Sequence, residues 1–299
     1  MARYLTLGNL LVEDVVLPGG RQALGRLGGD ALYAAIGARA FADDVVMVVR
    51  LGRGFPPELV CALERAGYAA GLIPSEHPAV RLWVELGVEG GSRFTFHERA
   101  GTYEQATPAL DEIPVRLTNG LDAVHVAPVP FPQMEALIRW ARPRARVLTV
   151  DPHYQHVRGR SADWRRVLSI VDGFLPSRDE AAGLLGGWPG TEEAARALAA
   201  LGAPIVCVKL GAEGSIGFRA EDELVVRMPA ASLDPIDPTG CGDAFCGGFL
   251  VGLAESGDLR TAMAQGTVSA GFVAQDHGAA HALTIDREAA QRRLAALLT

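Results

Sequence analysis

The fold of this chain is decided by the segment Asp237-Pro238-Thr239-Gly240-Cys241-Gly242-Asp243-Ala244-Phe245. Its two glycines let the backbone turn sharply and approach a ligand closely. The small apolar residues that follow predict a helix over 241–256, and the unpaired N–H groups and dipole at the start of a helix favour an anion. Asp243 falls in the first turn, so the segment predicts an anion cradle beside a carboxylate.

Phosphoryl transfer to an alcohol needs this combination of groups. The cradle stabilises the charge of the transferred phosphate, and the carboxylate accepts the proton of the attacking hydroxyl. On spacing alone, a structural glycine turn in which Asp243 only caps its helix stays open as an alternative, because glycine-rich helix starts are common.

The remainder of the chain alternates between short apolar runs and helical patterns. Strands are expected at 4–9, 45–49, 123–126, 147–150, 173–175 and 205–208, with a meander over 215–227. Helices are expected at 31–41, 56–66, 131–141, 178–185, 192–201, 241–256, 259–275 and 287–298. This alternation predicts an α/β fold with a mostly parallel central sheet and helices on both faces.

One stretch departs from this pattern. Apolar and polar residues alternate over 80–98 around the turn Gly90-Gly91, which predicts an antiparallel hairpin. An antiparallel excursion inside an α/β chain is typical of a flap or lid.

Composition narrows the function classes. The 299 residues include 28 basic and 35 acidic side chains, and a net charge of -7 disfavours nucleic-acid binding. The four cysteines form no CxxC pair, so neither a zinc site nor a disulfide framework is expected. No signal peptide and no apolar run of about 18 residues is present, so we expect a single-domain cytoplasmic protein without a membrane partner.

Several enzyme classes are excluded by inspection. The sole lysine, Lys209, follows Val208, which rules out a P-loop, and Gly8 lacks the neighbours of a dinucleotide-binding fingerprint. No Gly-x-Ser-x-Gly elbow of a serine hydrolase is present. His277 and His281 have helical i, i+4 spacing, but Gly278 lies between them and no glutamate follows His277, which disfavours a metal site.

The segment at 237–243, followed by Ala244-Phe245, resembles the C-terminal signature of the ribokinase family, also called the phosphofructokinase B family. Three further segments resemble family motifs in the same order along the chain. They are the Gly-Gly pair at 28–29, the Asp-Pro pair at 151–152 of fructokinase-like members, and the nucleotide-proximal turn at 209–214. The resemblance spans about residues 4 to 280.

The resemblance implies one domain over 1–299, a ribokinase-like three-layer α/β/α sandwich with a small β lid built from about 12–26 and 78–104. It implies an ATP-dependent carbohydrate kinase that transfers the γ-phosphate to a hydroxyl of a sugar, with Mg²⁺ as cofactor and K⁺ as a cation that some members bind. Lid strands of the family often pair between subunits, so a homodimer through the lid is one expectation.

Residue roles follow from the same resemblance. Asp243 is the expected catalytic base, and the backbone amides of Gly240, Cys241 and Gly242 are the expected anion hole. The expected nucleotide and cofactor residues are Lys209, Gly211, Gly214, Ser177, Glu180 and Asp237, with Glu180 organising Mg²⁺ through water. The expected acceptor residues are Glu13, Asp14, Gly28, Gly29, Tyr33 and Asp151.

The departures from the family pattern gather on the acceptor side. Glu13 stands where an aspartate is usual, so either the longer side chain reaches the acceptor or Asp14 replaces it. Tyr33 stands where an asparagine is usual and is expected either to stack on a ligand or to pack in the core. Ser177 replaces the asparagine of an Asn-x-x-Glu motif and keeps a single hydroxyl for hydrogen bonding.

Two alternatives stay open for the function. A nucleoside kinase on the same scaffold would stack a base on Tyr33 or Trp83, and a ligand sensor would bind without turnover. Retention of Asp243 argues against the sensor, which has no need of a base. His153 is a further candidate for a substrate contact, and Cys241 is expected to fill a small-residue position rather than act as a redox switch.

Overall fold

A computed structural model describes residues 3–17, 19–87, 92–231 and 235–299. Its strands form a nine-stranded sheet in the order β13-β12-β11-β10-β9-β8-β1-β4-β5 and a separate four-stranded sheet. The strands of the large sheet are β1 (Arg3–Leu7), β4 (Asp44–Arg53), β5 (Leu72–Pro78), β8 (Leu121–Val126), β9 (Ala145–Val150), β10 (Gly173–Phe174), β11 (Ile205–Lys209), β12 (Ser215–Arg219) and β13 (Leu224–Met228). All pairs from β5 to β11 are parallel, and β12 and β13 add an antiparallel edge.

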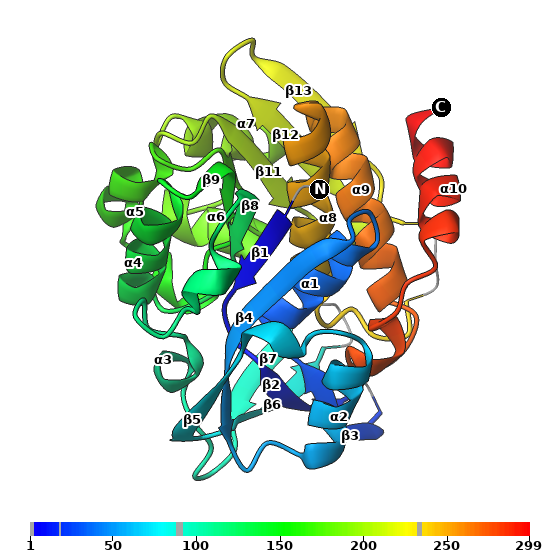
Figure 1. The fold of residues 1–299 in the computed structure, drawn as a ribbon. Coiled ribbons are helices and arrows are strands. Elements are labelled where there is room, and N and C mark those ends of the chain that lie inside the picture. The colour runs from blue at the N-terminus through cyan, green and yellow to red at the C-terminus, as the bar shows by residue number, and fades with distance from the viewer. Residues whose placement is uncertain (1–2, 18, 88–91, 232–234) are drawn as a thin grey trace.

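Helices cover both faces of the large sheet (Figure 1). One face carries α1 (Asp30–Arg39), α8 (Cys241–Ser256) and α9 (Leu259–Val273), with α2 (Pro57–Arg65) and α10 (Arg287–Leu298) packed against the same apolar core. The opposite face carries α4 (Phe131–Ala141), α5 (Ser161–Leu168), α6 (Arg178–Leu185) and α7 (Thr191–Ala199) around a second core. The predicted fold class, with a mostly parallel central sheet between two helical layers, is confirmed.

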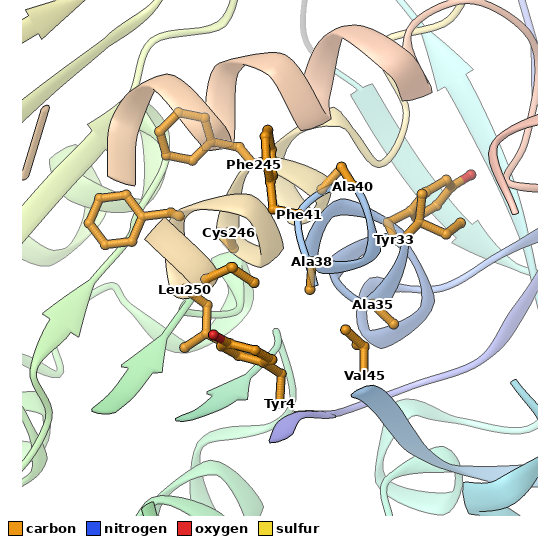
Figure 2. Packing of buried hydrophobic residues seen from close by; sticks show 14 of the residues in the cluster. Tyr4, Tyr33, Ala35, Ala38, Ala40, Phe41, Val45, Phe245, Cys246 and Leu250 are labelled. Carbon is orange, nitrogen blue, oxygen red and sulfur yellow. The ribbon is translucent and has the colours of Figure 1, made fainter. Parts of the chain in front are cut away.

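The backbones of α1 and α8 touch where the two helices cross. A Cβ added at Gly247 would overlap the carbonyl oxygen of Ala34, and one added at Gly37 would overlap that of Ala244. Figure 2 shows the small side chains at this crossing, which lies over β1 and β4. The start of α8 is therefore held against a rigid part of the core.

The four-stranded sheet has the order β3-β2-β6-β7. Its strands are β2 (Leu11–Val16), β3 (Gln22–Gly28), β6 (Val80–Leu86) and β7 (Ser92–Phe96). The antiparallel pairing of β6 with β7 confirms the predicted hairpin, whose turn at Gly90-Gly91 lies outside the described residues. The pattern of the sequence did not predict β2 and β3 as strands, because two acidic residues adjoin in β2 and glycines interrupt the alternation of β3.

Three further elements were missed: the edge strand β5 and the helices α5 and α3. Helix α5 is short and mostly polar, and it is held by Trp164, which is fully buried. The four-residue helix α3 (Tyr103–Ala106) begins with a capping box between Thr102 and Gln105. Across the described residues, no helix combines the length and the apolar character needed to cross a bilayer.

Candidate active site

A cleft of about 1560 Å³ opens at the carboxyl edge of the parallel strands. Its walls include residues that directly follow β9, β10 and β11, together with the starts of α1 and α8. This is the edge at which open α/β sheets bind ligands. The volume exceeds the roughly 300–1,000 Å³ that is usual for one small ligand. The cleft therefore has room for a nucleotide and a second molecule.

The segment that opened the sequence analysis forms one wall of the cleft. Gly240 precedes the first residue of α8 and has φ 77° and ψ -3°, a left-handed conformation that favours glycine. A Cβ at Gly240 would overlap the ring of Tyr33, so the loop also lies too close to α1 for a side chain. Cys241, Gly242 and Asp243 all line the cleft, which places the unpaired amides of the helix start and a carboxylate at the same wall.

Asp243 has an ionisation suited to a base near neutral pH. Burial raises the pKa of its carboxyl group to about 7, with the charge of Glu180 adding to the rise. The ammonium group of Lys209 lowers the same pKa and limits the shift. A carboxylate with a pKa close to the operating pH is well matched to general-base work.

Lys209 ends β11 and is the only lysine of the chain. Its ammonium group forms an ion pair with Asp151, which follows β9, and lies 3.5 Å from the sulfur of Cys246 on α8. A Cβ at Gly242 would lie 3.6 Å from the same nitrogen, so Lys209 adjoins the start of α8. Burial disfavours its charged form, but the negative charge of Asp151, Cys246, Glu180 and Asp243 outweighs burial and raises the pKa of Lys209 well above its usual value.

Asp151 keeps one free oxygen in this arrangement. Burial raises the pKa of Asp151 to about 6, and the charge of Lys209 opposes the rise. Its Oδ2 is engaged by Lys209, whereas its Oδ1 is shielded from solvent and has no hydrogen-bond partner among the described residues. Such an acceptor is available for a donor on a bound molecule.

Ser177 and Glu180 begin α6 with a capping box. Glu180 Oε2 accepts hydrogen bonds from the Ser177 amide at 2.7 Å and from its hydroxyl at 2.8 Å, and the Ser177 hydroxyl accepts one from the Glu180 amide at 3.3 Å. Burial is the main cause that raises the pKa of Glu180 to about 7. Both residues line the cleft, so the serine that replaces the usual asparagine fixes the glutamate in place.

The predicted nucleotide turn follows β11 as a short 3-10 helix over Gly211–Glu213. Gly211 and Gly214 have φ 62° and 88°, and a Cβ at Gly214 would overlap the carbonyl oxygen of Met228. Both glycines line the cleft beside Lys209. The turn therefore leaves this part of the cleft walled by backbone.

The predicted acceptor residues Glu13 and Tyr33 pair with each other. The Tyr33 hydroxyl donates to Glu13 Oε2 at 2.9 Å, and both side chains are buried. Burial raises the pKa of Glu13 to about 8. The Glu13 carboxylate lies against Gly28, where a Cβ would overlap it, and neither Glu13 nor Tyr33 lines the cleft in the described part of the chain. Of the two interpretations of Tyr33, core packing agrees with the structure (Figure 2).

Asp14 points to the other side of β2. Its carboxylate is engaged by Arg81 at 2.6 Å and by His97 at 2.7 Å, and it also accepts from the Gly25 amide. The expectation that Asp14 replaces Glu13 at the acceptor finds no support in this geometry. Trp83 stacks on His97 with ring centroids 4.7 Å apart, so it is not presented to the cleft as a base-stacking ring.

Asp30, which the sequence analysis did not single out, lines the cleft at the first residue of α1. Its Oδ2 is shielded and has no partner among the described residues. Burial, together with the charges of Asp243, Glu13 and Asp151, raises its pKa well above the usual value. The sequence did offer one sign of this role. Asp30 directly follows Gly28-Gly29, and the residue after that pair begins the helix.

Besides Phe245 of α8, four rings line the cleft: Phe94 of β7, Tyr103 of α3, His153 and Tyr154. Burial lowers the pKa of His153 to about 4, so its ring is neutral near pH 7. Its Nδ1 accepts from the Gln155 amide at 3.3 Å. The sequence identified His153 as a candidate contact but gave no sign that rings from three separate segments would gather.

His277 lies in a bend after α9, and its Nδ1 is 3.1 Å from Asp237 Oδ2. The other oxygen of Asp237 accepts from the Thr239 amide at 2.9 Å, so Asp237 shapes the loop. His281 instead contacts the Phe272 carbonyl oxygen. The two histidines therefore make separate contacts, one in a bend and one in a 3-10 turn.

Comparisons with known proteins agree with this architecture. A model of the pfkB family carbohydrate kinases matches residues 26–286. A cytidine kinase of Thermococcus kodakarensis is 26% identical over 275 residues, which cover 87% of this chain and 91% of that protein.

Solved structures share the fold at lower identity. Ribokinase from Giardia lamblia has a TM-score of 0.78 at 18% identity, covering 98% of this chain and 99% of its own. A fructokinase double mutant from Vibrio cholerae O395, bound to fructose, ADP and potassium, has a TM-score of 0.76 at 22% identity, covering 99% and 98%.

Proposed function

The chain belongs to the pfkB family of carbohydrate kinases, and we propose that it transfers the γ-phosphate of ATP to a hydroxyl group of a sugar or nucleoside. One observation carries the proposal. A single cleft brings together a glycine-lined helix start, the buried carboxylate of Asp243 and the ammonium group of Lys209. These are the anion site, the base and the fixed positive charge that phosphoryl transfer requires.

Asp243 acts as the base in this proposal. Its carboxylate takes the proton of the acceptor hydroxyl as the hydroxyl oxygen attacks the γ-phosphorus in line, and ADP leaves. The amides of Gly240, Cys241 and Gly242 donate to the phosphoryl oxygens as charge shifts toward the leaving group. Lys209 adds a positive charge next to the same place while its partner Asp151 fixes its position.

The nucleotide binds along the backbone-walled turn in this proposal, with Gly211 and Gly214 allowing close approach. Mg²⁺ fits the donors beside it, because Glu180 is a buried cleft carboxylate and Mg²⁺ is usually held by one or two carboxylates, waters and substrate phosphates. When bound, Mg²⁺ neutralises phosphate charge. In the described ranges no cluster of three or more His, Cys, Asp or Glu side chains forms a metal cage, consistent with a metal held largely through water.

A K⁺ ion fits the Asp237 loop less well. Both oxygens of Asp237 are engaged, one by the Thr239 amide and one by His277. A cation on Asp237 would have to displace His277. We therefore propose that turnover does not depend on which monovalent cation is present, and exchange of K⁺ for tetramethylammonium in the assay tests this directly.

The acceptor occupies the other end of the cleft, against Asp30 and Asp151 in this proposal, whereas Gly28 and Gly29 are buried just before Asp30 and do not line the cleft. The four-stranded sheet contributes Arg93 and Phe94 to the cleft wall and serves as a lid. Closure of such a lid excludes water that would otherwise take the phosphate. A cytoplasmic location and a homodimer through the lid belong to the same proposal.

Acceptor-dependent ADP release with Mg²⁺ and ATP tests the function. The panel contains hexoses, pentoses, keto-sugar acids and nucleosides, because the relative from T. kodakarensis is a cytidine kinase and a matched structure binds fructose. We expect turnover on one class well above the rate without an acceptor. ATP binding without acceptor-dependent ADP release on any class would favour a sensor and contradict the proposal.

A further inference from the structure

Four of the rings that line the cleft, those of Tyr103, His153, Tyr154 and Phe94, form a wall that runs outward from Asp30. Tyr103 lies near Asp30. Burial is the main cause that raises the pKa of the Tyr103 phenol, and the charge of Asp30 adds to the rise. Ring centroids are 4.8 Å apart from Tyr103 to His153, 4.8 Å from His153 to Tyr154, and 5.9 Å from Tyr154 to Phe94. We call Tyr103, His153, Tyr154 and Phe94 the aromatic wall.

Exposure rises along the aromatic wall. Tyr103 and His153 are 7% and 3% exposed, whereas Tyr154 and Phe94 are 41% and 39% exposed. Large apolar side chains are rarely left open to solvent inside a cleft without a binding role. The outer two rings therefore offer apolar faces to whatever fills this end of the cleft.

The inner end has the opposite character. Asp30 Oδ2 and Asp151 Oδ1 are shielded carboxylate oxygens without partners among the described residues, and Asp243 is nearby. Both oxygens can accept hydrogen bonds from hydroxyl groups of a bound molecule. The sole lysine is already paired with Asp151, and the arginines that line the cleft near this end, Arg93 and Arg158, are exposed. An acceptor with a carboxylate or phosphate is disfavoured here.

We propose, resting on the function proposed above, that the acceptor is a nucleoside, with its sugar hydroxyls on Asp30 and Asp151 and its base on Tyr154 and Phe94. A monosaccharide held at Asp30 by its hydroxyls has no flat aromatic ring of its own to stack on the two outer rings. A flat, uncharged ring joined to the sugar covers them. Base stacking on aromatic side chains is tolerant of base identity, so the wall selects for a base rather than for one particular base.

Matched pairs of acceptors test the proposal on the whole enzyme. Cytidine, uridine and adenosine are each compared with ribose at the same concentrations of ATP and Mg²⁺. We expect kcat/KM for the best nucleoside to exceed that for ribose by about 10–100-fold, the range that stacking of one base supplies.

Replacement of the outer ring sharpens the test. Tyr154→Ala is expected to lower the nucleoside-to-ribose ratio of kcat/KM by about tenfold, and Tyr154→Phe is expected to restore it, because the ring rather than the hydroxyl carries the contact. Val115→Ala is the control, since Val115 is 76% exposed, lies outside the four-stranded sheet and does not line the cleft.

The outcomes separate this inference from the proposed function. Ribose or a hexose turned over as well as every nucleoside would overturn the inference and leave the kinase in place. If no acceptor supports ADP release, the proposed function fails, and calorimetric titration with cytidine, uridine and adenosine then decides the inference. Nucleoside binding that Tyr154→Ala weakens would support it, and absence of nucleoside binding would overturn it.

Discussion

The two ends of the cleft are built in different ways. At the nucleotide end, the walls are backbone: the glycine turn before α8, with Gly240 at φ 77°, and the turn at Gly211–Glu213. At the acceptor end, the walls are side chains from α1, β7, α3 and the segment after β9. The difference teaches that the phosphate-handling chemistry depends on local sequence, whereas acceptor choice depends on side chains that only the fold brings together.

Loss of the base is expected to produce the largest effect. Asp243→Asn removes the proton acceptor but keeps the size and hydrogen-bonding shape of the side chain. We expect kcat to fall by roughly 10²–10⁴, with the Kd for ATP nearly unchanged. Steady-state ADP release and calorimetry measure the two quantities. Asp111→Asn, on an exposed carboxylate, is the control, and near wild-type kcat in Asp243→Asn would remove Asp243 from its proposed role.

Lys209 joins the two ends, because it pairs with Asp151 and adjoins Gly242. Lys209→Met removes its charge and leaves the buried Asp151 with only the Cys246 thiol, 3.4 Å from its Oδ2, as a partner. We expect kcat to fall by about 10²-fold, whichever acceptor is used, because a fixed charge near the phosphoryl group is lost. Lys209→Arg is expected to recover part of the rate. A loss confined to one acceptor would assign Lys209 to the acceptor end alone.

Glu13 tests whether the acceptor end includes a carboxyl group that burial keeps protonated. In the folded protein the pKa of Glu13 is about 8, above the ordinary glutamate value of 4.5, so between these pH values the folded state binds a proton that the unfolded state has lost. The free energy of unfolding therefore falls as pH rises from about 4.5 to 8. Glu13→Gln removes this contribution. We compare the free energy of unfolding of Glu13→Gln with that of wild type, and we expect the difference, variant minus wild type, to be roughly 2–4 kcal/mol more positive at pH 8 than at pH 5.

Urea unfolding at both pH values measures this change. Other buried carboxyl groups, including Asp30 and Glu180, also make the free energy of unfolding depend on pH, and they do so similarly in both proteins. The difference between the two proteins is therefore the informative quantity. Equal slopes in wild type and variant would show that Glu13 is ionised in the folded protein.

The rigidity of the nucleotide end is tested at the helix crossing. Gly247→Ala places a methyl group against the Ala34 carbonyl oxygen and forces α8 away from α1. We expect a loss of about 1–3 kcal/mol in the free energy of unfolding. Gly257→Asn is the matched control on the same helix, because Gly257 has φ 66° and open space around it, and asparagine tolerates that conformation. Equal stability of both variants would contradict the close crossing.

The sequence predicted several local backbone features, because their signals lie close together in the chain. The glycines before Asp243, the start of α6 at Ser177 and Glu180, and the β6–β7 hairpin each depend on residues close together in the chain. The hydrophobic pattern likewise predicted the alternation of strands and helices, and it missed α5 because one buried tryptophan holds an otherwise polar helix.

The acceptor end was less predictable for the opposite reason. Nothing near Tyr33 in the sequence shows that its hydroxyl meets Glu13, twenty residues earlier. The aromatic wall joins Phe94, Tyr103, His153 and Tyr154, and no periodic pattern links them. The pairing of His277 with Asp237 is a contact across forty residues, and the spacing of His277 and His281 gave no sign of it.

The most direct test of the central claim is the pH dependence of kcat/KM for ATP in wild type and in Asp243→Asn, at saturating acceptor, because this quantity reports ionisation of the enzyme before ATP binds. Burial raises the pKa of Asp243 to about 7, so the base is protonated below that pH. We predict that wild-type kcat/KM falls about tenfold per pH unit below an apparent pKa near 7, and that the residual rate of the variant lacks this fall. Ionisation of ATP affects both proteins equally. The same acid limb in both proteins would contradict the assignment of Asp243 as the catalytic base.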